Sequence, residues 1–270
     1  MPRPCTIPEL TANLRRLGVS YGGVVMVHAS MRALGPVERR AEGVVEALDA
    51  SVGPEGTLLM VLGAHDDWAW VNERPEAERS SLLTDAVPFD CRLTPAEEDV
   101  GVLAEVFRTT PGTLVSDHPE GRFGARGRRA RELVDNVPWD DYYGPGSPLE
   151  RLVEADGQVL RLGADPNTIT LTHYAEYLAA VPHKRRVRRT RRIATPRGSE
   201  IRTIDCLDDS SGIVEYAGGD YFEVILEAYA GQGGVHRGAV AKAVAELIRA
   251  RPFVQFAARW MERQLTPSVE

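Results

Sequence analysis

One histidine and one glutamate near the middle of the chain have the residue types and spacing of a proton-transfer pair. His173 and Glu176 stand three residues apart in a segment, residues 168–180, whose apolar spacing predicts a helix. Side chains three apart on a helix lie on one face, so these two can contact each other. An imidazole titrates near neutral pH, and a carboxylate can orient it and stabilise its protonated form. The alternative is a core histidine beside a solvated glutamate.

Other histidines suggest a different chemistry, metal-dependent hydrolysis. Its ligands would come from five residues spread along the chain: His28, His65, Asp66, His118 and His173. No HExxH or other compact ligand spacing joins them, so we expect no metal. His28 ends a predicted strand and is either a site residue or a structural one. His118 precedes Pro119 and is expected to fix a turn.

The distribution of charge favours a cationic ligand. The chain carries a net charge of −7, yet residues 183–192 (HKRRVRRTRR) hold seven basic side chains and no acid. The remaining 260 residues hold 25 basic and 39 acidic groups, and an acidic body attracts cations. Some of the acids are expected to line one cleft beside His173. The candidates for binding a cationic substrate are Asp66, Asp67, Asp90, Glu98, Asp208 and Asp209.

Two of these predictions leave an alternative open. Asp208 and Asp209 lie in the sequence DDSSG, and aspartates in such a segment also form turns with their own backbone. The arginines of residues 186–195 are expected to form a β-hairpin with residues 200–205 around Pro196 and Gly198. Such a ribbon could bind nucleic acid. No aromatic interleaving or nucleic-acid motif accompanies it, so contacts with nearby acids are the preferred interpretation.

The elements that must position these residues indicate an α/β fold. Residues 24–28 and 57–62 read as buried strands and residues 38–52 as a helix between them, which is a βαβ unit. The loop after the first strand of such a unit usually contacts a ligand, although here it lacks the glycines of a Walker or GxGxxG loop. The candidates for cofactor contact are Ser30, Met31, Arg32, Leu34 and Gly35, with Ser116 further along the chain.

The rest of the chain is expected to complete a single domain, residues 1–270. Residues 63–99 are irregular and acidic, and helices are predicted at residues 100–108, 127–136 and 148–155, the last capped by Ser147. The last sixty residues are expected to form two or three helices, one of them supported by Val240, Val244 and Leu247.

The composition indicates in which cellular compartment the protein is expected. No apolar run approaches a membrane span, and the N-terminus has no signal-peptide core. The three cysteines form neither a disulfide framework nor a zinc pattern, which is typical of a reducing cytoplasm. The sequence leaves the oligomeric state open, a homodimer included.

Several stretches in order resemble the aminoglycoside 3-N-acetyltransferase family, the antibiotic N-acetyltransferases. They include VVMVHASMRALGPV, GPEGTLLM, SDHPEGRFGARG, the run from YGPGSPLERL through LTHYAEYLAAVPHKRR, and DDSSGI. The resemblance covers about residues 9–262. It implies a mixed central sheet flanked by helices, with a β-hairpin and a mostly helical second region, distinct from the GNAT fold.

The resemblance also implies an activity. Members transfer acetyl from acetyl-CoA to the 3-amino group of a 2-deoxystreptamine aminoglycoside, and His173 matches the catalytic base. The expected partners are therefore acetyl-CoA and an aminoglycoside, with no nucleic acid and no membrane. The segment 63–99 does not follow the family pattern residue by residue, so the range of accepted antibiotics stays open.

Overall fold

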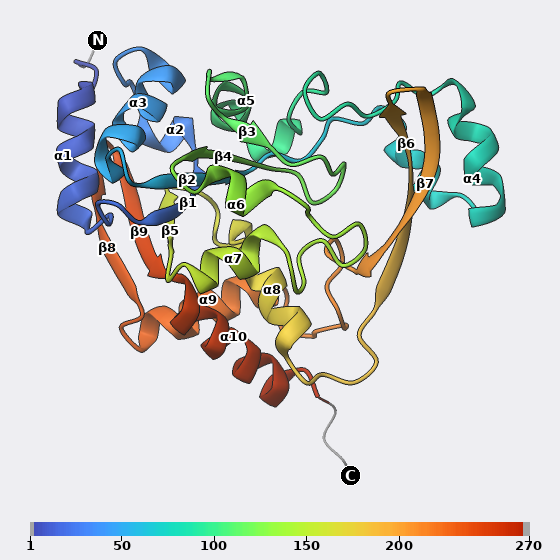
Figure 1. The fold of residues 1–270 in the computed structure, drawn as a ribbon. Coiled ribbons are helices and arrows are strands. Elements are labelled where there is room, and N and C mark those ends of the chain that lie inside the picture. Colours follow the sequence, from blue (N-terminus) through green and yellow to red (C-terminus); the bar gives the residue numbers. More distant parts are fainter. Residues whose placement is uncertain (1–2, 267–270) are drawn as a thin grey trace.

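A seven-stranded mixed sheet forms the centre of the computed structural model, which describes residues 3–266 (Figure 1). The strands lie in the order β3-β4-β2-β1-β5-β9-β8, with β2, β1 and β5 parallel and the other neighbours antiparallel. Their bounds are β1 Val24–Ala29, β2 Thr57–Val61, β3 Leu114–Val115, β4 Phe123–Gly127, β5 Gln158–Leu162, β8 Val235–Val240 and β9 Ala243–Arg249.

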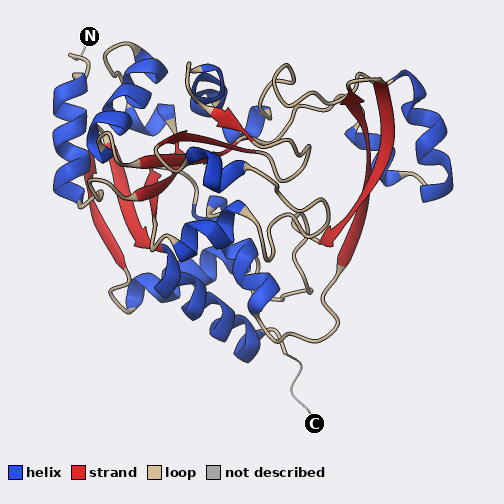
Figure 2. Cartoon of the chain, viewed as in Figure 1, coloured by secondary structure: helices blue, strands red, loops and turns tan. Residues whose placement is uncertain are grey.

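Helices cover both faces of this sheet because its central strands bury side chains on both sides (Figures 1 and 2). In β1, Val25 and Val27 face α1 (Ile7–Leu17), α2 (Met31–Leu34), α3 (Arg40–Val52) and α5 (Val102–Thr109). Val24 and Met26 face the opposite helices. Those are α6 (Ala130–Val134), α7 (Pro148–Glu154), α8 (Leu171–Leu178), α9 (Tyr221–Gly231) and α10 (Ala250–Gln264).

The predicted hairpin stands apart from the sheet. Strands β6 (Arg186–Thr195) and β7 (Gly198–Leu207) pair with each other in a sheet of their own, on the side of the molecule opposite α1 (Figure 1). The acidic segment lies beside it, with α4 (Glu76–Leu82) and the 3₁₀ helices η1 (Ala69–Glu73) and η2 (Leu83–Asp85). The predicted fold class, a mixed sheet flanked by helices with a separate hairpin, is confirmed.

The prediction for the last sixty residues is partly wrong. Among the described residues of this segment, 211–266, only α9 and α10 are helices. The part around Arg237 forms β8 and β9, which extend the central sheet. Val244 is 69% exposed, whereas Ala243, Ala245 and Leu247 are buried. This alternation has the period of a strand, and the supposed helical spacing of Val240, Val244 and Leu247 was a coincidence.

A second prediction, a helix over residues 127–136, is also wrong in its first part. Gly127 ends β4, which was not predicted, and α6 begins only at Ala130. Short helices also stand where none was predicted: α2 in the loop after β1, and α4 in the segment 63–99 that was expected to be irregular. The helix that holds His173 differs only at its ends. The predicted helix at 168–180 is shorter, because the 3₁₀ helix η4 (Pro166–Thr168) precedes α8 and only Leu171–Leu178 is α-helical. Ser147 caps α7 as predicted, accepting a hydrogen bond from the Glu150 amide.

Candidate active site

His173 and Glu176 contact each other on α8. His173 Nδ1 lies 2.8 Å from Glu176 Oε2, and the Glu176 side chain is 1% exposed. An ionised carboxylate only accepts hydrogen bonds, so the ring carries a proton on Nδ1. In the neutral ring Nε2 is then the nitrogen that can take up a proton. Nε2 makes no hydrogen bond with any residue that the structure describes. The alternative of a solvated glutamate is wrong.

A tyrosine, which sequence reasoning missed, holds the second oxygen of Glu176. The Tyr221 hydroxyl donates to Glu176 Oε1 and accepts a hydrogen bond from the Ile213 amide at 3.0 Å. Tyr221 is the first residue of α9, so the catalytic candidate on α8 is tied to a helix distant in the chain. No local spacing could have revealed this contact.

Aromatic rings enclose the imidazole. Tyr143 stacks on it with centroids 4.9 Å apart, and Phe222 meets it edge-on at 4.8 Å. Burial lowers the pKa of His173, but Glu176, through its charge and hydrogen bond, and Asp209 together prevail and raise it above its ordinary value. The environment therefore stabilises the protonated ring, so the neutral ring is a stronger base than a free imidazole.

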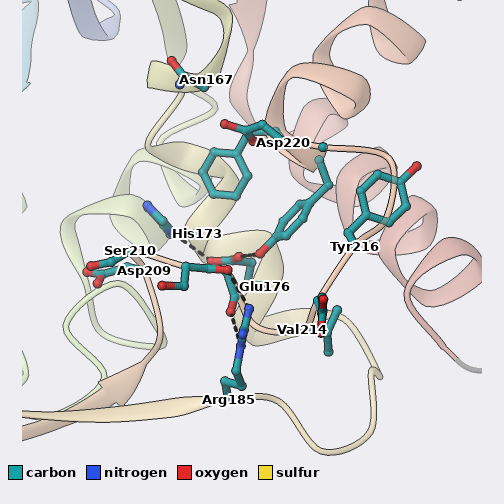
Figure 3. Close-up of a pocket in the computed structure, with 15 residues that line it drawn as sticks. Asn167, His173, Glu176, Arg185, Asp209, Ser210, Val214, Tyr216 and Asp220 are labelled. Atoms are coloured by element: carbon teal, nitrogen blue, oxygen red, sulfur yellow. Dashed lines mark hydrogen bonds and ion pairs between the residues drawn. The ribbon is translucent and has the colours of Figure 1, made fainter.

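Two cavities meet at His173. The first, which we call the acidic cavity, has a volume of about 680 Å³ and contains four carboxylates, Glu176, Asp209, Glu215 and Asp220, with one arginine, Arg185 (Figure 3). The second, the α2 cavity, has a volume of about 610 Å³. Both cavities are lined by Asn167, His173 and Phe222, so the imidazole of His173 can contact groups bound in either cavity.

The α2 cavity contains part of the predicted cofactor loop. Ser30, Met31 and Arg32 line it, and Ser30 caps α2 by accepting from the Ala33 amide at 3.3 Å. Two further candidates lie elsewhere. The Leu34 side chain is fully buried in the core, and Gly35 ends α2 close to Lys242; neither lines this cavity.

Ser116, the sixth cofactor candidate, is a structural residue in this fold. Its hydroxyl is buried, donates to the Gly121 carbonyl at 3.2 Å and accepts from the Phe123 amide at 2.8 Å. It therefore fastens the connection between β3 and β4 and lines neither of the cavities at His173.

The adjacent aspartates Asp208 and Asp209 do different things. Asp208 accepts from the Ser210 and Ser211 amides at 3.0 and 2.9 Å, so it forms the turn. Asp209 takes no part in these turn hydrogen bonds and lines the acidic cavity. Arg185 holds the same turn by donating to the Ser211 and Gly212 carbonyls (Figure 3).

The other predicted substrate acids are not brought to His173. Asp66, Asp67 and Asp90 line a third cavity of about 280 Å³ beside the hairpin. Asp66 pairs with Arg191, and Asp90 caps the amides of Arg92 and Leu93. Glu98 lies in the 3₁₀ helix η3 (Glu98–Val100) and lines none of the three cavities, whereas its neighbour Asp99 lines the α2 cavity.

The residues proposed for a metal site stay apart. His118 is buried, accepts from the Glu120 and Gly121 amides through Nδ1 and donates from Nε2 to the Trp139 carbonyl, so it fixes the turn as predicted. The imidazole of His65 contacts Asp67, and burial and Arg161 lower the pKa of His28 to about 3. Within residues 3–266 no group of three or more His, Cys, Asp or Glu side chains could hold a metal ion.

The arginine ribbon is largely neutralised inside the protein. Arg186 pairs with Asp141 and Asp205, and Arg188 with Glu76. Arg189 and Arg191 pair with the acids Asp66, Glu120 and Asp209. This agrees with the preferred interpretation of the ribbon. No helix in the described part of the chain has the length and apolar character needed to cross a membrane.

Fold and site together define a mixed α/β protein with a hydrogen-bonded histidine–glutamate pair between two cavities. The family model for aminoglycoside 3-N-acetyltransferase matches residues 26–262, and the chain belongs to that family. The aminoglycoside N(3)-acetyltransferase III of Pseudomonas aeruginosa is 36% identical, the match covering 98% of this chain and 96% of the relative. The membership confirms the resemblance found in the sequence.

Two solved structures show the same fold. AAC-IIIb, determined as a binary complex with CoASH, superimposes with a TM-score of 0.91 and 36% identity, covering 98% of this chain and all of that one. Sisomicin-bound AAC-VIa superimposes with a TM-score of 0.90 and 32% identity, covering 97% of this chain and 99% of that one. Both superpositions cover nearly the whole of this chain.

Proposed function

We propose that this protein transfers the acetyl group of acetyl-CoA to the 3-amino group of a 2-deoxystreptamine aminoglycoside. The observation that carries the proposal is the position of His173, oriented by Glu176 and placed where the acidic cavity and the α2 cavity meet. Its Nε2 can therefore act on an amine bound on one side and a thioester bound on the other. The relatives bound to CoASH and to sisomicin support the same pair of substrates.

The chemistry of the two cavities supports a different substrate in each. An aminoglycoside carries several ammonium groups at neutral pH, which suits the acidic cavity. Acetyl-CoA carries a pyrophosphate, which suits the exposed Arg32 and the backbone amides at the start of α2. Asn167, Thr168 and Thr170 line the α2 cavity near His173 and are candidates to donate to the oxyanion of the tetrahedral intermediate.

The unprotonated 3-amine attacks the thioester carbon, and the new C–N bond forms while the carbonyl oxygen becomes an oxyanion. His173 Nε2 accepts the proton that the amine loses, and Glu176 stabilises the resulting imidazolium through Nδ1. The intermediate collapses by breaking the C–S bond. The proton leaves with the thiolate as CoASH, and the amide is released.

A panel of aminoglycosides incubated with acetyl-CoA tests the proposal, with released thiol measured and the acetylated nitrogen located by NMR. We expect thiol release with at least one 2-deoxystreptamine compound, acetylation at N3, and a higher inhibitory concentration in a susceptible bacterium expressing the protein. Consumption of acetyl-CoA also fits the cytoplasmic location expected from the sequence. Folded protein that binds CoA and acetylates no member of the panel would overturn the proposal.

A further inference from the structure

Asp209, the partly buried acid of the acidic cavity, is already paired with a cation of the protein itself. Arg189 Nη2 lies 2.5 Å from Asp209 Oδ1, and the Tyr142 hydroxyl lies 2.5 Å from Oδ2. The side chains of Arg189 and Asp209 are each 16% exposed. Both oxygens of the carboxylate thus have a donor, and its charge is compensated before any ligand arrives.

Arg189 is held firmly in this position. Its guanidinium also donates to Tyr142 Oη at 3.0 Å and to Ser210 Oγ at 2.8 Å. Behind it, Glu120 Oε2 lies 3.9 Å from Arg189 Nε, and Glu120 Oε1 lies 2.9 Å from Arg191 Nη1. Arg191 in turn pairs with Asp66 at 3.0 Å. The charges therefore alternate along a row, in the order Asp209, Arg189, Glu120, Arg191, Asp66.

The remaining acids of the cavity are weaker sites for a cation. Glu176 is occupied by His173 and Tyr221. Glu215 and Asp220 are exposed, where water screens their charge, and Asp220 also caps α9. A partly buried carboxylate attracts an ammonium more strongly than an exposed one, because the effective dielectric constant around it is lower. Without its ion pair to Arg189, Asp209 would be the strongest site for a cation among the four carboxylates.

We propose that Arg189 is a built-in counter-ion that sets how strongly the acidic cavity binds polyamines. A substrate ammonium must share Asp209 with this guanidinium, so the cavity binds polyamines less tightly than its carboxylates alone would allow. Arg189 acts through Asp209 and is a specificity-determining residue, not a catalytic one. This inference rests on the proposed function, because it assumes that the acidic cavity is the amine side of the site.

The test compares Arg189→Gln with Arg188→Gln by calorimetric titration with sisomicin and, separately, with CoA. Both variants lose one positive charge from β6, but Arg188 is 53% exposed and pairs with Glu76. We expect Arg189→Gln to lower the Kd for sisomicin about tenfold, an amount typical of removing one nearby charge at intermediate burial. Arg188→Gln should change it less than twofold, and neither variant should change CoA binding.

For a second variant, Glu120→Gln, we expect the Kd for sisomicin to change in the opposite direction. This variant keeps the test decisive if Arg189→Gln does not fold. Glu120→Gln removes the acid that compensates Arg189 from behind, so Arg189 should hold Asp209 more completely and the Kd for sisomicin should rise. Arg189→Lys, which keeps the charge, should stay near wild type. Sisomicin binding that is weaker or unchanged in a folded Arg189→Gln protein would overturn the inference. If Arg189→Gln does not fold, sisomicin binding that is unchanged or tighter in Glu120→Gln would overturn it.

Binding is titrated without acetyl-CoA, so the outcomes for the two proposals separate. Wild-type protein that binds sisomicin but acetylates no aminoglycoside would contradict the proposed function alone. Wild-type protein that acetylates sisomicin, with equal Kd in wild type and Arg189→Gln, would contradict the counter-ion role alone.

Discussion

At the scale of single residues, the site depends on how the two nitrogens of His173 are used. Nδ1 is committed to Glu176, which leaves Nε2 for the substrates. The ring is clamped between Tyr143 and Phe222, so its orientation does not depend on a bound ligand. Pre-orientation of this kind lowers the entropy that must be lost when substrates bind.

Replacement of His173 by alanine should abolish most turnover and leave the fold intact. A general base contributes about 10²–10⁴-fold to a rate, so we expect a fall in kcat of that size. The melting temperature should fall only modestly, because the ring is partly exposed at a cavity surface. His236→Ala is the control, since His236 is exposed on β8. Near-normal turnover in a folded His173→Ala protein would remove this residue from the mechanism.

Changing the partners of His173 should move the acid limb of the pH–rate profile in opposite directions. Glu176 raises the pKa of His173, so Glu176→Gln should lower it. The base works only when neutral, so the remaining activity of that variant should persist to lower pH. Tyr221→Phe removes the hydroxyl that competes for the charge of Glu176, so the limb should move to higher pH.

The other charged groups that influence the ring, Asp209 and Arg189, are unchanged in both variants. Measurement of kcat/KM against pH for wild type and the two variants checks the prediction. Limbs that coincide in all three proteins would show that the titrating group is not His173.

At the scale of elements, the start of α2 decides what the α2 cavity can hold. Ser30 both caps this short helix and lines the cavity. Ser30→Leu should therefore raise the KM for acetyl-CoA more than the KM for the aminoglycoside, because the larger side chain fills the space. Ser30→Ala is the matched control, since it removes the cap, at a cost of about 1 kcal/mol, without filling the cavity. A larger effect on the aminoglycoside would place α2 on the antibiotic side instead.

At the scale of the whole molecule, the net charge of −7 acts together with the local acids of the cavity. Asp209→Asn should weaken sisomicin binding about tenfold and leave CoA binding unchanged, since it leaves Arg189 uncompensated beside the amine. Asp67→Asn is the control, with the same change in net charge at an 82% exposed side chain in the third cavity. Sisomicin binding should also weaken as salt shortens the screening length below about 8–10 Å.

Calorimetric titration of wild type and both variants at two ionic strengths measures these effects. Equal sisomicin affinity in wild type and Asp209→Asn would show that Asp209 takes no part in holding the antibiotic.

The sequence by itself determined the features that depend on local spacing and on the family resemblance. The contact of His173 with Glu176 follows from helical periodicity, and the β6–β7 hairpin from two strand-like runs around a Pro–Gly turn. The cap of α7 by Ser147 is equally local. Each of these features lies within one continuous segment of the chain, where the backbone geometry of a helix turn or of a hairpin sets the distances.

Only the tertiary structure decided which distant groups meet. It joined Tyr221 to Glu176 and Arg189 to Asp209, separated Asp66 from His173, and turned Val235–Val240 into a sheet strand. The physical reason is that the sequence does not show which distant residue a charged group or a hydroxyl will contact. Their partners are chosen by burial, because a buried polar group must find a donor, an acceptor or an opposite charge wherever the packed chain brings one.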